Sequence, residues 1–371
     1  MTRRPRAWRL ATAALTALGL SAILAACGQS QAESTAATTA ATTAGSTAET
    51  TAPTGDTTVA AGTVDTSGVT LRIGETGWKS QQLLLEKAGL ADTPYKTEFS
   101  LFQGGNLQLE ALGAGAIDLA SASEIPPIFA ARSGGQGSLD VIAVREGNTL
   151  TQEVVVPEGS AITDVAGLKG KKVAYVQNTT AHYFLYKALE QAGLAWTDIE
   201  AVPLSTSDGL AALLAGQVDA LASYGNAIIT AHANGATTLV DAKDILSGNF
   251  VYVSTPTIIA DPAKKAAIAD LFSRLQRGFN WARDNPDAWA AVTAEQTKQP
   301  VEQALGTFTD GEAQRPSKFV PTSPEATASE QDVLDTFVKA GILKSSFDIG
   351  DYWTDAFNPE LTSIEAEYVA G

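Results

Sequence analysis

GAIDLASASEIPPIF, at residues 115–129, is the stretch that decides how this chain folds. Gly115 can end a preceding helix, because glycine tolerates the left-handed conformation found at helix C-termini. Residues 117–120 are short and largely apolar, which predicts a parallel strand covered on both faces. Residues 121–124, SASE, then place small polar side chains, backbone N–H groups and one carboxylate after that strand. The two prolines that follow prevent further ladder pairing, so the stretch predicts a helix end, a buried strand and an exposed polar loop.

Further along the chain, a second stretch repeats this pattern. Residues 213–219, LLAGQVD, resemble residues 112–118, LGAGAID. Residues 189–194, LEQAGL, resemble residues 85–90, LEKAGL, in the same order. These similarities favour two related α/β lobes, although a chance match between common helix ends is the alternative. Open α/β sheets bind ligands at the carboxyl ends of their strands, so two facing lobes would form a ligand cleft.

The composition limits the classes of function. The chain has 371 residues, 44% of them hydrophobic, which is enough for two domains with a large core. Its 25 basic and 41 acidic residues give a formal net charge of −16. We expect no nucleic-acid partner, because that binding depends on lysine and arginine neutralising phosphates. With Cys27 as the single cysteine and only two histidines, we expect no disulfide, no metal, no cofactor and no catalytic residue.

The N-terminus has the features of an export signal. Residues 1–9 are basic and residues 10–26 are apolar, as in a secretory signal peptide. The segment ends in LAACG, which resembles a bacterial lipobox. This resemblance implies that Cys27 becomes the lipidated first residue of the mature protein and attaches it to the membrane. A plain signal peptide with an incidental cysteine, or an uncleaved anchor, is the alternative.

The following segment predicts a tether and then two lobes. Residues 28–68 are rich in Thr, Ala and Ser and contain neither Lys nor Arg, so they cannot bury enough surface to fold. We therefore expect a signal peptide at 1–26, and the lipidated cysteine with a disordered tether at 27–68. We expect a discontinuous first lobe at 69–153 and 254–371, and a second lobe at 154–253, because the extended segments at 152–156 and 250–253 have the character of crossovers.

Within the folded part, apolar strands alternate with helices, which is the pattern of a parallel sheet. Ser80 is expected to cap a helix over residues 81–88, since serine oxygen accepts from the first backbone N–H groups. Asp261, followed by proline, is expected to start a long C-terminal helix. The last helix is expected at about residues 328–340.

Three segments of the chain resemble the solute-binding proteins of ABC importers for taurine, aliphatic sulfonates and nitrate. They are IDLASASEIPPIFA at 117–130, LKGKKVAYVQNTTAHYFLYKALEQAGL at 168–194 and AGQVDA at 215–220. The resemblance covers about residues 69–360. It implies an α/β, two-lobed periplasmic-binding-protein-like fold of type II, with the ligand cleft between the lobes.

The same resemblance implies the function and the partners. Such proteins capture a small organic anion by lobe closure, here above all an aliphatic sulfonate or a taurine-like compound, and deliver it to an ABC permease in the membrane. We expect a monomer that is not an enzyme and lies on the outer face of the cytoplasmic membrane, held there by lipid on Cys27. In one departure from the family, Tyr224-Gly225-Asn226 stands where sulfonate-type members usually carry a Trp-Asp/Ala-Pro turn.

The best candidate for an anion site is the start of the helix that follows Thr179 and Thr180. A helix N-terminus offers unpaired N–H groups and partial positive charge, which suit a sulfonate, phosphate or carboxylate. An ordinary helix cap is the alternative. His182 lies in the first turn, and taurine-type members carry a histidine in the matching stretch, although a lone histidine can also be structural.

The expected ligand-binding residues gather at the predicted ends of strands and starts of helices. They are Thr76, Gly77, Trp78, Gln103, Ser121, Ser123, Glu124, Thr179, Thr180, His182, Tyr224 and Asn226. If Glu75 and Glu124 both line the cleft, they would repel a bare inorganic anion and suit a ligand that also carries an amine or hydroxyl donor. Otherwise they are solvated loop carboxylates.

Two other classes of function are open from the sequence. Some relatives of this fold are enzymes, desulfinases or proteins that make the thiamine pyrimidine, and they use cysteine or histidine chemistry. Cys27 lies outside the predicted fold, which argues against thiol catalysis. A lipoprotein that senses a ligand without transporting it has the same sequence features as the transport protein.

Overall fold

The computed structural model describes residues 64–132 and 139–368, so the export signal, Cys27 and nearly all of the tether lie outside the described residues. The chain divides into two compact units, residues 1–60 and 61–371, and the second holds every described residue. Among the helices of the described part, none is long and apolar enough to cross a membrane.

The elements of this unit fall into three consecutive groups. The first comprises β1 (Thr70–Thr76), α1 (Ser80–Lys87), β2 (Lys96–Phe102), α2 (Gly105–Gly113), β3 (Ala120–Ser123), α3 (Pro126–Arg132) and β4 (Asp140–Glu146). The second comprises β5 (Gln152–Val156), β6 (Lys172–Tyr175), α4 (Thr180–Gln191), β7 (Glu200–Pro203), α5 (Thr206–Leu214), β8 (Ala220–Tyr224), α6 (Asn226–Ala233) and β9 (Thr237–Asp241). The third comprises β10 (Asn249–Ser254), α7 (Pro256–Ile259), α8 (Pro262–Asp284), α9 (Pro286–Thr297), α10 (Val301–Gln314), β11 (Lys318–Val320), α11 (Pro324–Lys339) and α12 (Asn358–Glu365).

The strands form three sheets that separate the middle of the chain from its two flanks. β1 and β2 pair in parallel, and a second sheet has the order β11-β4-β10-β3. The third sheet, β7-β6-β8-β5-β9, uses strands of the middle group alone. The chain thus leaves the first group after β4 and returns to it at β10, which is the connectivity of a discontinuous lobe. The exact lobe boundaries remain a prediction.

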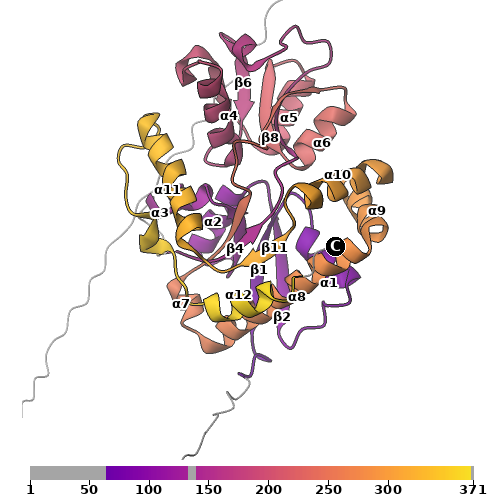
Figure 1. Cartoon of the computed structure of the whole chain (residues 1–371), viewed down its shortest axis with the longest axis vertical. Helices are drawn as coiled ribbons and strands as arrows, with labels where there is room; N and C mark the ends of the chain where they lie inside the picture. The colour runs from indigo at the N-terminus through magenta and orange to yellow at the C-terminus, as the bar shows by residue number, and fades with distance from the viewer. Residues whose placement is uncertain (1–63, 133–138, 369–371) are drawn as a thin grey trace, which may run out of the picture. The chain divides into compact units, whose positions relative to one another are not determined.

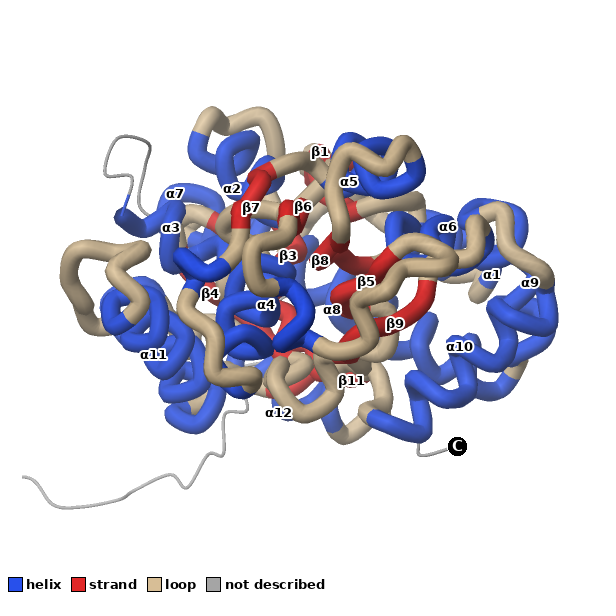
Figure 2. Tube along the Cα trace, turned by 90° about the horizontal axis from the view of Figure 1, so that it is seen from above, coloured by secondary structure: helices blue, strands red, loops and turns tan. Residues whose placement is uncertain are grey.

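The middle sheet, in which β7, β6 and β8 pair in parallel and β5 and β9 join antiparallel, is covered by helices on both faces. Figure 1 shows α4 on one side of β6 and β8, and α5 and α6 on the other. Figure 2 shows the same strands between these helices from above. Val173 and Ala222 pack with Phe184 of α4, whereas Ala174 and Leu221 pack with Leu213 of α5. Alternate residues of each strand therefore face opposite helices.

The strand expected at 117–120 is the main error of the sequence-based assignment. The strand β3 begins at Ala120 and pairs antiparallel with β10, while a single parallel bridge joins Leu119 to Ile73. The physical reason is Asp118, whose buried carboxylate lies 2.8 Å from both Arg72 and Lys264. These residues tie the segment to β1 and α8, so the ladder starts only after them. The polar residues 121–123 are therefore part of the strand.

The helix caps follow the expectation in one case and depart from it in another. Asp261 Oδ1 accepts from the N–H groups of Ala263 and Lys264 at 2.9 and 3.2 Å, as predicted. Ser80 is inside α1 and makes no cap, so that prediction is wrong. The buried Glu75 carboxylate takes this role, accepting from Gln81 N at 2.5 Å. The expected helix at 328–340 lies within α11, but α12 follows it.

The two crossovers between the groups lie side by side. The Gly147 N–H donates to the carbonyl of Gly248 at 3.0 Å. Arg315, just after α10, contacts both connections, with Nη2 at 3.1 Å from Glu146 Oε1 and from Asn249 Oδ1. If the middle group rotates relative to the flanking groups, the backbone of these two connections must change conformation.

This pairing makes a prediction for Gly248, which has φ +73° and no room for a side chain. An added Cβ would overlap the carbonyl oxygen of Gly147. Gly341 has the same φ of +73° but open space around it, so it is a matched control. We expect Gly341→Ala to lower the free energy of unfolding by about 1 kcal/mol and Gly248→Ala by clearly more, about 2–3 kcal/mol. Urea denaturation measures both, and equal losses would contradict close packing of the crossovers.

Candidate functional site

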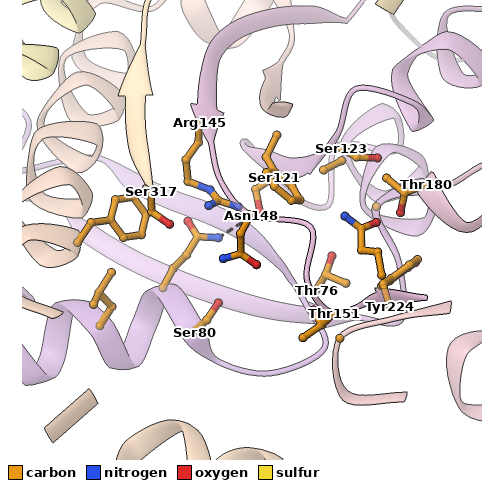
Figure 3. A pocket seen from close by; sticks show the side chains of 18 of the residues that line it. Thr76, Ser80, Ser121, Ser123, Arg145, Asn148, Thr151, Thr180, Tyr224 and Ser317 are labelled. Carbon is orange, nitrogen blue, oxygen red and sulfur yellow. Dashed lines mark hydrogen bonds between the residues drawn. The ribbon is translucent and has the colours of Figure 1, made fainter. Parts of the chain in front are cut away.

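A pocket of about 390 Å³ lies where the middle group meets the flanking groups. Its lining comes from β1, α1 and β3, from the crossover after β4, from the start of α4 and the end of β8, and from α8, α9 and α10. Figure 3 shows polar side chains from these segments pointing into it. Half of the predicted ligand-binding residues line this pocket: Thr76, Ser121, Ser123, Thr179, Thr180 and Tyr224.

One side of the pocket presents hydrogen-bond donors at the start of α4; we call Ser123, Thr179, Thr180 and Tyr224 the helix pole. The Thr179 hydroxyl donates to the carbonyl of Val176 at 2.7 Å, so it stabilises the turn before the helix. Within the described part of the chain, the N–H groups of Thr180 and Ala181 have no acceptor, as expected in the first turn of a helix.

Tyr224 adds a buried hydroxyl to the helix pole. In the described residues this hydroxyl makes no hydrogen bond, and the Thr179 hydroxyl, which donates to Val176, lies close to it. Burial raises the pKa of Tyr224 to about 12, so the group is a neutral donor at physiological pH. Leaving a buried hydroxyl unpaired costs about 1–3 kcal/mol, so a ligand atom that accepts from it would be stabilised there.

The polar floor of the pocket is held by buried amides. Gln108, which is fully buried, donates from Nε2 to Thr76 Oγ1 at 2.7 Å and to the Ser121 carbonyl at 2.8 Å. Gln81 donates from Nε2 to Ser121 Oγ at 3.1 Å and accepts from the Tyr252 hydroxyl at 2.9 Å. The hydroxyls of Thr76 and Ser121 are therefore fixed before any ligand binds.

Sequence reasoning missed Arg145, which lines the pocket at the end of β4. Its guanidinium carbon lies 4.4 Å from the ring centroid of Phe250, its register partner on β10, and 5.8 Å from that of Phe279. Across residues 64–132 and 139–368 its side chain makes no hydrogen bond and no ion pair. Burial lowers the pKa of Arg145. The sequence feature that could have revealed Arg145 is a basic residue directly after an apolar strand.

The remaining wall of the pocket is apolar and was also missed. It comprises Leu84, Phe279, Ala282, Trp289 and Phe308. The predicted residue Trp78 is outside the lining and stacks on Trp289, with ring centroids 5.6 Å apart. Trp78 therefore supports a wall residue.

His182 lies outside the pocket lining in an aromatic cluster. Its ring centroid is 4.9 Å from that of Tyr175 and 5.1 Å from that of Phe337. Burial lowers the pKa of His182 to about 4, and Nδ1 accepts from the N–H of Asn178 at 3.3 Å. The neutral imidazole thus holds the turn before α4, in which Asn178 has φ +59°. Direct contact with ligand remains a prediction.

The two carboxylates considered for the cleft are both buried behind its surface. Glu124 accepts from Ser247 at 2.5 Å, Ser329 at 3.1 Å and Asn249 at 3.2 Å, and burial raises its pKa. Glu75 is fully buried at the start of α1. Since neither lines the pocket, the argument that they would repel a bare anion does not apply.

The other predicted residues are not part of the pocket lining. Gln103 accepts from the Thr206 hydroxyl of α5 at 2.9 Å, and Asn226 begins α6. Gly77 has φ +81° in the turn after β1. Cys27 is outside the described residues. Among residues that the structure describes, no cluster of three or more His, Cys, Asp or Glu side chains could hold a metal ion.

Glu75 makes stability depend on pH. Burial raises its pKa from the ordinary 4.5 to about 7, so between these values the folded protein keeps a proton that the unfolded chain releases. Its contribution to the free energy of unfolding therefore falls as pH rises through this window, by about 1.4 kcal/mol per pH unit at most. Glu75→Gln removes the titration, so the variant should gain stability relative to the wild type from pH 4.5 to 7.

Urea denaturation of the wild type and Glu75→Gln at several pH values measures this effect. Glu110→Gln, on the exposed face of α2, is a control for loss of one carboxylate at the surface. A stability difference between wild type and Glu75→Gln that is independent of pH would contradict the burial argument.

Comparisons with known proteins agree with this architecture. A family model described as NMT1/THI5 like matches residues 100–289. A candidate aliphatic sulfonates-binding protein of Escherichia coli is 30% identical over 293 residues, covering 77% of this chain and 88% of the relative. The periplasmic aliphatic sulphonate binding protein SsuA of Escherichia coli has a solved structure with TM-score 0.65 at 28% identity, over 76% of this chain and 96% of SsuA.

Two further structures extend the comparison. The alkanesulfonate-binding protein SsuA of Xanthomonas axonopodis pv. citri, bound to MOPS, gives TM-score 0.69 at 26% identity, over 77% of this chain and 98% of that one. The desulfurization enzyme DSZB gives TM-score 0.55 at 17% identity, over 79% and 99%, which shows a shared fold alone. The predicted fold class, a two-lobed periplasmic-binding-protein-like α/β fold, is confirmed, as is the family resemblance.

Proposed function

The chain belongs to the NMT1/THI5-like family, and from that premise we propose that it is the extracytoplasmic solute-binding component of an ABC importer. Its ligand is a small organic anion of the aliphatic sulfonate or taurine-like class. The sulfonate-binding proteins compared above support this proposal at the level of fold and sequence.

The observation that carries the proposal is the helix pole. A sulfonate has three acceptor oxygens and no donor. This side of the pocket has donors that lack a partner, the Tyr224 hydroxyl and the N–H of Thr180, and the N–H of Ala181 follows in the same helix turn. The helix dipole adds partial positive charge at the same place. Thr76, Ser121 and Ser123, which the sequence predicts to bind ligand and which line the pocket, are part of this proposal.

Closure of the two lobes would bury the ligand. The pocket lining comes from both sides of the paired crossovers at Gly147 and Gly248, so a rotation there changes the width of the pocket. A ligand that contacts both sides favours the closed state by its differential affinity. The lobe boundaries that we propose, 153/154 and 253/254, come from the sequence pattern and lie close to these crossovers in the chain.

The proposal includes the placement of the protein outside the cytoplasmic membrane. The basic and apolar N-terminus would direct export, and lipid on Cys27 would attach a monomer to the outer face, beside its permease. These features rest on sequence pattern alone. Catalysis is not part of the proposal, because the pocket lining contains no cysteine or histidine.

Ligand-induced stabilisation of the full-length protein tests the function. A ligand at 100 times its dissociation constant adds about 2.7 kcal/mol to the free energy of unfolding, which raises Tm visibly. We expect propane-1-sulfonate or taurine to raise Tm, and sulfate, nitrate and butyrate to have little effect. A response to another class, with none to any sulfonate, would contradict the ligand assignment.

Tyr224→Phe tests the helix pole. Because the hydroxyl has no protein partner in the described structure, its removal should leave the free energy of unfolding unchanged or slightly higher, while sulfonate affinity falls about tenfold. Tyr95→Phe is the matched control: its hydroxyl donates to Asp270 at 2.9 Å outside the pocket, so stability should fall and affinity should not. Calorimetric titration and urea denaturation give both quantities. Unchanged affinity in Tyr224→Phe would show that the hydroxyl does not bind the ligand.

A further inference from the structure

Resting on the proposed function, we propose that the ligand carries a second oxyanion, a carboxylate, and that Arg145 binds it at the side of the pocket away from the helix pole. The ligand class is then an ω-sulfoalkanoate: a sulfonate at one end, a carboxylate at the other and a short apolar body between them. Arg145 and Asn148 form the second subsite, which we call the arginine pole.

No carboxylate of the described residues forms an ion pair with Arg145, and the nearby Glu312, which attracts it, is shared with Arg283. The carboxylate of Glu312 also lines the pocket, but its Oε2 lies 3.0 Å from Arg283 Nη1, and both of its oxygens accept from the N–H of Ser317 at 3.2 Å. Glu312 and Arg283 therefore neutralise each other. Counting these three side chains leaves one positive charge, on Arg145.

The guanidinium is oriented and ready to bind. Its carbon lies over the ring of Phe250 on the neighbouring strand, 4.4 Å from the ring centroid, and its N–H groups have no acceptor among the described residues, so they can bind a planar, bidentate acceptor. Asn148 lies beside it in Figure 3, and its Oδ1 accepts from Leu150 N at 3.3 Å, so its Nδ2 remains a donor. The arginine pole is therefore a second group of donors, matched to a carboxylate.

The two poles are separate places in one pocket. Figure 3 shows Arg145 and Asn148 on one side, and Thr180 and Tyr224 on the other. Arg145 is at the end of β4, whereas Tyr224 is at the end of β8 in another sheet and Thr180 begins α4. A sulfonate seated on the helix pole leaves Arg145 unpaired, and a partly buried unpaired cation is unfavourable. A second anionic group on the same ligand removes that cost.

The apolar wall suits the body of such a ligand. Leu84, Ala282 and Phe308 line the pocket with no polar atom in their side chains. They can pack against methylene groups of the ligand, while the hydroxyls of Thr76 and Ser121 remain on the polar floor of the same pocket. The charged ends of the proposed ligand are assigned by the two poles, and its methylene groups by this wall.

Calorimetric titration of the full-length protein tests the proposal with matched ligands. The probes are ω-sulfoalkanoates with two to five methylene groups, each compared with its ω-sulfoalkanamide, which replaces one carboxylate oxygen by an amide nitrogen and removes the charge. Propane-1-sulfonate is the reference with one anion. We expect at least one carboxylate to bind about 30-fold more tightly than its amide.

Variants then assign this preference to Arg145. Arg145→Met should remove the preference for carboxylate over amide and leave the affinity for propane-1-sulfonate within about threefold. Arg145→Lys keeps the charge and should retain part of the preference, which covers the case in which the methionine variant fails to fold. Arg277→Met, at an exposed site on α8, changes the net charge equally and should retain the full preference.

The outcomes separate the inference from the function on which it rests. Equal binding of every carboxylate and its amide, with sulfonates still bound, overturns the second subsite and leaves the proposed function intact. An equal loss of all sulfonates, propane-1-sulfonate included, in Arg145→Met shows that Arg145 holds the sulfonate itself and also overturns the inference. Absence of binding by any sulfonate overturns the proposed function together with the inference.

Discussion

The site depends on one strand, β10, which returns from the middle of the chain and runs antiparallel between β3 and β4. Its pairing brings Phe250 opposite Arg145 on one side and opposite Ser123 on the other. One strand therefore sets the position of Arg145 in the arginine pole relative to Ser123 in the helix pole. The same return places Gly248 against Gly147 and keeps the two crossovers together. The position of the pocket, its floor and its hinge therefore follow from one register.

Buried hydrogen bonds fix the polar floor of the pocket. At the two poles, by contrast, side chains lack hydrogen-bond partners. Gln81 and Gln108 use their amides to fix the hydroxyls of Ser121 and Thr76, as a polar network must do when it is buried. Tyr224 and Arg145 lack such partners within the described chain. Natural proteins keep few unsatisfied buried groups, and these two face the same cavity. We base the proposed ligand site on this contrast between the hydrogen-bonded floor and the poles, where partners are missing.

Local patterns in the sequence were sufficient for part of this picture. Some features depend only on residues close together in the chain and were therefore predictable. They are the alternation of strands and helices, the two threonines at the start of α4 and the aspartate before α8. The start of β3 was not predictable, because the ion pairs of Asp118 join residues far apart in the chain. Arg145 was missed for the same reason: its isolation depends on Glu312 being paired with Arg283, which only the fold reveals. Glu75 likewise has the look of a loop carboxylate until α1 buries it.

The central claim is that the start of α4 and the Tyr224 hydroxyl receive a sulfonate. A crystal structure of the full-length protein with propane-1-sulfonate tests it most directly. The account predicts sulfonate oxygens at about 2.7–3.2 Å from the Tyr224 hydroxyl and from the N–H of Thr180 or Ala181. A sulfonate bound elsewhere in the molecule, with these donors left without a ligand, would contradict it.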